Sequence, residues 1–268
     1  MTTPAALPGD SMYIESMKRV GFLVALLLSA VPMLALNLSG SPTIIPVVGR
    51  FPGAGGTQWR TDVFVTNPGI NATVVTLRFY QSGGPLREHT FAISPFGTVT
   101  LPDIVLNTFG QENAAGVLEV SVPPPFGTLA RATIYNSGNP AGRFGQGVPG
   151  IALSYLNRQA YLFGLSGIDG TRLNIGAANP NDIPVEVNIQ VTDSSNTVLH
   201  SRLVTVAAHA YVQYNDIFTT FGITPQAGVT VGMNTFDPLV NRPIYGYASE
   251  VRNDTGDAIF TFGTSPNS

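Results

Sequence analysis

The chain has no cysteine in its 268 residues, which excludes disulfides, thiolate metal sites and thiol catalysis. Charged residues make up only 11%, against about 25% in typical soluble domains. The sole lysine is Lys18 and the formal net charge is −3, so we expect no nucleic-acid partner. This scarcity of charge suits a protein outside the cytosol or one that buries surface against neighbours, although a compositional bias of the genome explains it equally well.

A long apolar run occurs only near the N-terminus, where Lys18-Arg19 precedes the uncharged residues 20–36. A basic pair followed by about 15 apolar residues is typical of a secretory signal, and the run is short for a membrane-spanning helix. The cleavage site is poor at both Ala35 and Gly40, and translation starting at Met17 is an alternative to Met1. We therefore predict that residues 1–40 are a signal peptide or an N-terminal anchor. The rest is predicted to be secreted, at the cell surface or periplasmic, with membrane contact only through this segment.

The remainder of the chain repeats itself at an offset of about 112 residues. The recurring pairs are Arg60 and Arg172, Asn67-Pro68 and Asn179-Pro180, Asp103-Ile104 and Asp216-Ile217, and Gly116-Val117 and Gly228-Val229. A repeat of this length indicates two copies of a whole domain rather than a short-repeat solenoid. We place the domains at 41–155 and 156–268.

Short apolar runs, rich in β-branched and aromatic residues and bounded by Gly, Pro, Asn or Asp, follow one another through both copies. The run Val185–Val191 alternates most clearly, with four aliphatic residues on one face. The predicted fold class is all-β, with two tandem antiparallel β-sandwiches of immunoglobulin or fibronectin III type. Pro102–Phe109 and Asn215–Phe221 are exceptions, each predicted to form one helical turn capped by an Asp and a Gly.

The order of these motifs resembles an uncharacterised family of secreted bacterial proteins with tandem immunoglobulin-like β-sandwich modules. The motifs are Trp59-Arg60-Thr61-Asp62, Asn67-Pro68, Leu77-Arg78-Phe79-Tyr80, Asp103-Ile104, Phe109-Gly110, Leu118-Glu119-Val120 and Asp254-Thr255-Gly256-Asp257. The resemblance covers nearly all of residues 42–262. It implies export and a β-sandwich, and it implies no catalytic residues.

Three residues are candidate ligand contacts. Trp59, the only tryptophan, follows a glycine-rich stretch and would stack on a sugar ring if exposed, or else cover one end of the core. Arg60 and Arg172 would grip an anionic ligand, or else pair with the recurring Asp103 and Asp216 as a structural clamp.

A candidate cation site lies near the C-terminus, where Asn253, Asp254 and Asp257 bring several side-chain oxygens into one short segment. Hard cations such as calcium prefer oxygen ligands. The same residues are also what a hairpin turn requires, because Asn, Asp and Gly tolerate positive φ. Calcium is the one cofactor considered; otherwise none is expected.

Signals of enzymatic chemistry are missing from the sequence. The three histidines have no metal-ligand spacing, and no Gly-x-Ser-x-Gly nucleophile motif or phosphate-binding loop occurs. We therefore predict an exported, non-enzymatic, structural or adhesive protein that contacts other proteins or its own copies through sheet edges. The alternative is a carbohydrate-binding module that uses Trp59 and nearby aromatic residues, with a hydrolase of unrecognised site as a third hypothesis.

Overall fold

The computed structural model describes residues 40–53, 56–138, 142–236 and 242–265. Apart from Gly40, the predicted signal or anchor lies outside the described residues. These residues belong to one compact unit, Leu38–Ser268. Within these ranges, no helix is long and apolar enough to cross a membrane.

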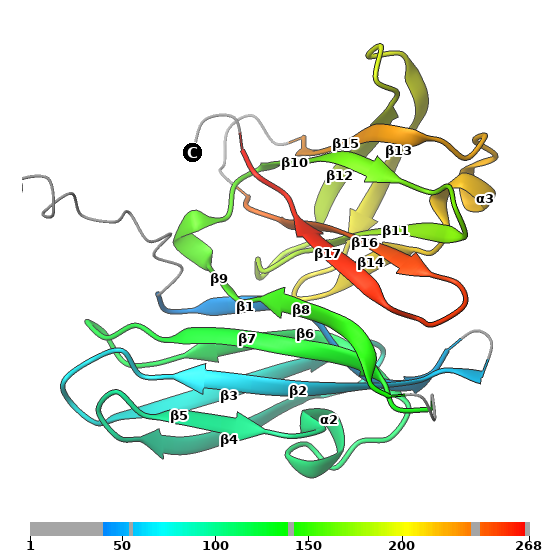
Figure 1. Cartoon of the computed structure of the whole chain (residues 1–268). Helices are drawn as coiled ribbons and strands as arrows, with labels where there is room; N and C mark the ends of the chain where they lie inside the picture. The colour runs from blue at the N-terminus through cyan, green and yellow to red at the C-terminus, as the bar shows by residue number, and fades with distance from the viewer. Residues whose placement is uncertain (1–39, 54–55, 139–141, 237–241, 266–268) are drawn as a thin grey trace, which may run out of the picture. The chain divides into compact units, whose positions relative to one another are not determined.

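The first half of this unit consists of antiparallel strands with one short helical turn (Figure 1). Its elements are β1 (Thr43–Pro52), β2 (Gln58–Thr66), β3 (Thr73–Gln81), β4 (Leu86–Ile93), β5 (Thr98–Leu101), α2 (Ile104–Asn107), β6 (Ala114–Ser121), β7 (Leu129–Asn136), β8 (Phe144–Pro149), β9 (Ile151–Ala152) and the 3-10 turn η2 (Leu153–Tyr155). The strand order is β4-β3-β6-β1-β2-β7-β8, with β5 beside β2 and β9 beside β1. Strand β1 pairs with β6 along most of its length and with β2 at its end, so it joins two sheets at a corner.

The second half is also antiparallel, and the prediction of an all-β fold with antiparallel sheets is confirmed. Its elements are β10 (Gln159–Ser166), β11 (Thr171–Ala178), β12 (Val185–Thr192), β13 (Val198–Val206), β14 (Tyr211–Tyr214), α3 (Ile217–Phe221), β15 (Ala227–Thr235), β16 (Tyr245–Arg252) and β17 (Ala258–Phe262). They form two sheets, β10-β15-β12-β13 and β14-β11-β16-β17. This order matches β1-β6-β3-β4 and β5-β2-β7-β8 of the first half, strand for strand.

The arrangement differs from an immunoglobulin constant domain in its sheet membership. There the first strand shares a sheet with the second, and the seventh shares a sheet with the sixth. Here β1 lies mainly beside β6, whereas β7 lies beside β2. The β-sandwich therefore differs from an immunoglobulin constant domain in having its first and seventh strands in exchanged sheets.

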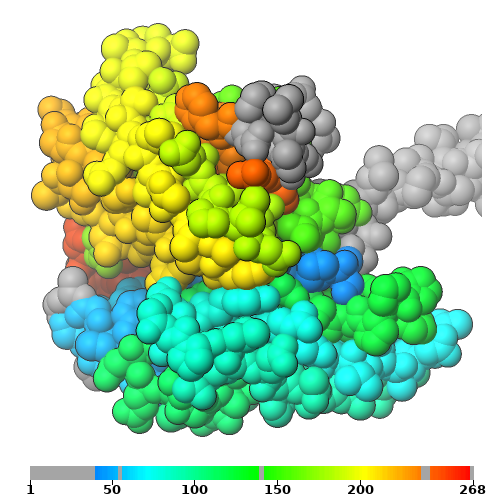
Figure 2. Space-filling model, turned by 180° about the vertical axis from the view of Figure 1, so that it is seen from behind, coloured from blue at the N-terminus to red at the C-terminus, as the bar shows by residue number. Residues whose placement is uncertain are grey.

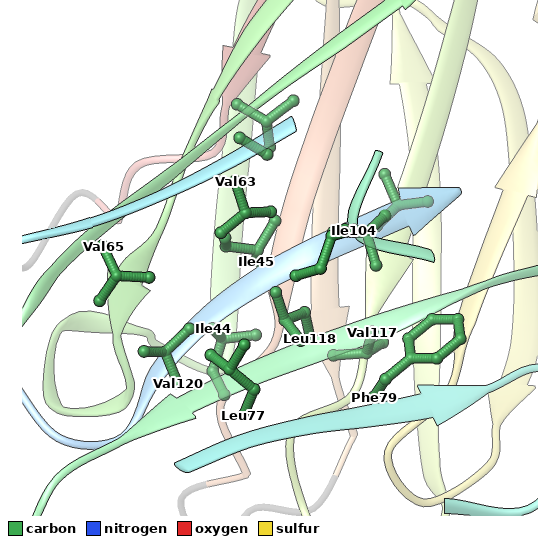
Figure 3. Close-up of a cluster of buried hydrophobic side chains, with 14 of the residues drawn as sticks. Ile44, Ile45, Val63, Val65, Leu77, Phe79, Ile104, Val117, Leu118 and Val120 are labelled. Atoms are coloured by element: carbon green, nitrogen blue, oxygen red, sulfur yellow. The ribbon is translucent and has the colours of Figure 1, made fainter. Parts of the chain in front are cut away.

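Each half has its own hydrophobic core, formed by alternate residues of facing strands. In β3, Val75, Leu77 and Phe79 are fully buried and alternate with more exposed neighbours. Figure 3 shows how Leu77 and Phe79 lie with Leu118 and Val120 of β6 beneath β1. Each such side chain stabilises the fold by about 1.5–3 kcal/mol on burial.

The two helical turns start at Asp103 and Asp216, as the sequence predicts, but the aspartate side chains do not cap them. Both residues adopt left-handed backbone conformations, with φ of 41° and 44°, and neither makes a side-chain cap hydrogen bond. Their backbone N–H groups instead donate to Asp62 and Asn174 of the neighbouring strands. The aspartates thus fix each turn to its sheet rather than closing its N-terminus.

The second half packs directly on the first, and β16 contributes side chains to both cores. Tyr245 and Tyr247 are each 1% exposed and belong to the core cluster of the first half. The Tyr245 hydroxyl donates to the carbonyl of Pro149, at 2.8 Å. The ring of His209 stacks on Tyr80 with centroids 4.1 Å apart. In Figure 2 the yellow segments of the second half lie against the cyan segments of the first.

Candidate functional site

A pocket of about 330 Å³ opens where the two halves meet. Its size is at the lower end of the range of about 300–1000 Å³ that is typical of small-molecule sites. The first half supplies the end of β1, Trp59 and Gln146, and the second half supplies β11, β14 and β16. Neither half forms the pocket alone.

Aromatic rings form the apolar part of the pocket. They are Phe51, Trp59 and Tyr247. Trp59 is half-buried and lies so close over Gly53 that a Cβ there would be 2.4 Å from its indole nitrogen. The glycine-rich stretch before β2 therefore brings the backbone under the indole. The ring packs against the first core and also lines the pocket.

Arg172 brings a positive charge to the opposite wall. Its guanidinium donates to Asn253 Oδ1 at 2.8 Å, and none of its nitrogens lies within ion-pair distance of a carboxylate in the described residues. Burial lowers the pKa of Arg172, and the negative charge of Asp216 partly offsets this effect. Asp216 also lines the pocket. One cation and one anion therefore face the same space without a direct contact.

Side-chain amides complete the polar lining. Oxygen atoms of all four accept bonds within the protein: Gln213 from Tyr247, Gln146 from Ser249, Asn174 from the backbone of Asp216, and Asn215 from Gln213. In the described ranges, no acceptor is bonded to the amide nitrogens of Gln146, Asn174 and Asn215. A set of hydrogen-bond donors therefore remains for an oxygen-rich ligand.

Arg60 lies outside this pocket, although it occupies the same repeat position as Arg172. Its Nε lies 3.6 Å from Asp103 Oδ2, and Arg50 pairs with the same carboxylate. This is the structural clamp that the recurring Arg and Asp residues suggested. In the second half Gly167 stands at the position of Arg50, because Gly167 lies opposite Gln226 as Arg50 lies opposite Ala114. Asp216 accepts a hydrogen bond from the Thr219 hydroxyl at 2.6 Å and also lines the pocket.

The candidate calcium residues lie in the turn between β16 and β17, and the structure gives their oxygens other partners. Asn253 Oδ1 accepts from Arg172, and Asp254 accepts two bonds from Arg252 at 3.2 and 3.0 Å. The Arg252 guanidinium lowers the pKa of Asp254. Asp257 accepts from the backbone of Ala258. No group of three or more His, Cys, Asp or Glu side chains suited to a metal ion occurs in the described part of the chain.

Sequence reasoning singled out Trp59, Arg172 and Asp216 but not the amide side chains or Tyr247. One signal was present, because Asn174 and Tyr247 stand at the repeat positions of Asp62 and Tyr135. In the first half Tyr135 donates a hydrogen bond to Asp62, and the guanidinium of Arg143 lies over the Tyr135 ring. These side chains fill the corresponding position in the first half.

No family model matches the chain, and no curated protein matches it significantly. A candidate secreted protein from Parabacteroides distasonis is similar over 83% of this chain and 76% of its own, with 8% identity and a TM-score of 0.20. A Ruminococcus gnavus beta-glucuronidase in complex with uronic isofagomine matches 81% of this chain and 34% of its own, with 13% identity and a TM-score of 0.16. A Pleurotus ostreatus lectin in complex with GalNAc matches 85% of both chains, with 13% identity and a TM-score of 0.16. These scores are too low to support an argument about this chain.

Proposed function

We propose that the chain is an exported, non-enzymatic adhesive protein of the cell surface or periplasm, whose two tandem immunoglobulin-like modules hold a carbohydrate pocket between them. The observation that carries the proposal is the pocket itself, which joins the only tryptophan to Arg172 and three unengaged amide donors. Aromatic faces stack on the apolar face of a sugar ring, and amide and guanidinium groups bind its hydroxyls.

The charges in the pocket favour a neutral sugar over an acidic one. Arg172 alone would attract a carboxylate, but Asp216 lines the same space and opposes it. The volume suits one sugar ring, such as the end of a glycan chain, rather than an extended polymer.

Several features support a binding role over catalysis. The pocket lining contains a single carboxylate, Asp216, and no histidine. The three histidine rings instead lie against aromatic rings: His89 against Phe91, His200 against Phe221 and His209 against Tyr80. A paired general acid and base, which most hydrolytic sites require, is thus missing from the lining.

Glycan-array binding tests the proposal. The wild type is expected to bind neutral glycans, and Arg172→Gln is expected to weaken binding about tenfold, because a hydrogen bond to a charged group contributes about 1.5–3 kcal/mol. Trp59→Ala is expected to weaken it at least as much. Arg202→Gln is a matched control on the exposed side of β13. Equal binding by Arg172→Gln and Arg202→Gln, or no binding by the wild type, would refute the proposal.

A second candidate function is structural, through the outermost strands β4 and β13. Each ends the order of its sheet and exposes apolar side chains, with Leu86 49% and Leu203 53% exposed. Unpaired edge strands are templates for strand addition by another chain. Pairing of this kind would make the protein a structural component that associates with itself or with other proteins.

A further inference from the structure

The contact between the two halves joins a docking surface on the second half to a receiving surface on the first half. Each half has a counterpart of both surfaces. The second half docks with the loop pair formed by residues 179–184 and 207–210, together with one face of β16. The first half receives it on the outer face of β1, β3 and β6, where His209 stacks on Tyr80. It also receives it on β8, whose Pro149 and Gln146 accept hydrogen bonds from Tyr245 and Ser249. Among the described residues, Phe163 is 68% exposed on the second half's own version of this receiving face, and Phe96 and Ile70 are 69% and 76% exposed on the first half's own version of the loop pair.

The two loop pairs have the same construction. In the second half, His209 has φ of 51°, its N–H donates to the carbonyl of Asn181, and its ring stacks on Tyr80 of the first half. In the first half, Phe96 has φ of 54° and its N–H donates to the carbonyl of Gly69. Phe96 is 69% exposed, and Ile70 of the neighbouring loop is 76% exposed. Phe96 and Ile70 therefore form an exposed apolar pair on the first half, at the positions with which the second half contacts the first.

The two receiving faces also have the same construction. Strand β1 has a bulge between Ile45 and Val48, and β10 has one between Leu162 and Leu165, opposite corresponding residues of β6 and β15. The bulge residues of β1, Pro46 and Val47, are buried. In β10 the place of Pro46 is taken by Phe163, which is 68% exposed.

We propose that these two surfaces bind each other, so that the first half of one copy docks on the second half of the next copy. The chain would then continue between molecules the contact that it already makes within itself. The occupant of the face around Phe163 is thus the loop pair of a second copy, with Phe96 and Ile70 at its centre. A contact of this heterologous kind does not close on itself unless its rotation forms a ring, so copies associate head to tail.

The contact between copies is weaker than the one within the chain. Thr133 stands at the repeat position of Tyr245, and Phe64, with Arg131 over its ring, stands at that of Gly176. The rest of the docking face is accordingly more polar, as in transient interfaces. We expect reversible, concentration-dependent association.

Sedimentation velocity of residues 38–268, which contain both cores and all the sheets, tests this proposal. The mean mass of the wild type is expected to rise with concentration through dimers to longer species. Phe96→Asn and Phe163→Thr are each expected to remain monomeric, because each loses one side of the contact. Asn is well tolerated at the positive φ of residue 96.

Mixing the two variants is the decisive step. Each retains the side that the other lacks, so an equimolar mixture is expected to form dimers and nothing larger. The matched control Ile259→Thr, which removes another side chain that is 67% exposed, is expected to associate like the wild type. A monomeric wild type, association that survives in both variants through sheet edges, or a mixture that fails to form dimers would overturn the proposal.

Discussion

Asn67 and Asn179 each tie three stretches of backbone together at one end of a sandwich. Both are almost completely buried, at 2% and 0% exposure. The amide nitrogen of Asn179 donates to the carbonyls of Ile183, Val206 and Ala207, and that of Asn67 makes the corresponding contacts. One side chain thus supplies hydrogen-bond donors to carbonyls at the end of a strand and in the adjoining loops.

Replacing either asparagine with alanine is expected to lower the free energy of unfolding by about 2–4 kcal/mol, because buried carbonyls lose their donors. Chemical denaturation of Asn67→Ala and Asn179→Ala measures the effect. Asn71→Ala, in the same loop but exposed, is expected to change it little. If Asn67→Ala or Asn179→Ala lowers the free energy of unfolding no more than Asn71→Ala does, the prediction is contradicted and water replaces the amide.

The recurrence of Asn-Pro was evident in the sequence, but its role was not. The carbonyls that Asn179 contacts include some 27 and 28 residues away, and no local pattern identifies them. The reverse holds for Arg60, whose pairing with Asp103 was one of two interpretations because both residues recur at matching places.

Among the secondary structure elements, β16 contributes Tyr245, Tyr247 and Ser249 to the junction on one face and carries Glu250 on the other. Burial raises the pKa of Glu250, although its carboxylate accepts a hydrogen bond from the backbone of Ser166 at 2.5 Å. A raised pKa in the folded state means that the ionised carboxylate destabilises the fold at neutral pH.

Glu250→Gln keeps an acceptor oxygen and removes the charge, so the variant is expected to melt at a higher temperature than the wild type near pH 7. The unfolded chain gains stability by ionising as the pH rises above the ordinary pKa of a glutamate, about 4.3, so the difference should vanish below about pH 4. Melting temperatures across this pH range test the sign. Glu186→Gln, which is exposed on β12, is the control. A difference that stays constant with pH would contradict the assignment.

Elements with clear alternation could be predicted closely. The predicted run Val185–Val191 coincides with β12 to within one residue. Strand β4 was not singled out, because its sequence Leu-Arg-Glu-His-Thr-Phe-Ala-Ile carries its charges on an edge that is mostly exposed. The helical turns were located correctly, but their left-handed aspartates depend on contacts to a neighbouring strand.

In the molecule as a whole, the two halves share buried side chains and should unfold together. Tyr245 lies in the second half but is buried among residues of the first. Tyr245→Ala is expected to cost about 4 kcal/mol, as for other large buried aromatic side chains. Calorimetry should show one transition for the wild type and two for the variant. Tyr155→Ala, at a residue that is 55% exposed, should keep one transition, and two transitions in the wild type would contradict this coupling.

The pocket could not be predicted as a unit from the sequence. Trp59 and Arg172 were both singled out, but their proximity depends on how one half packs on the other. That packing in turn depends on differences between the copies, such as Gly176, which leaves space for the ring of Tyr247. A sequence repeat shows which residues the two halves share. The pocket depends on residues that differ between them, so the repeat does not predict it.

A pocket walled by two unlike halves belongs to a junction rather than to a module. Neither half by itself contains the set of residues that the junction brings together. Exchanging the order of the two halves would therefore abolish the site while preserving both folds.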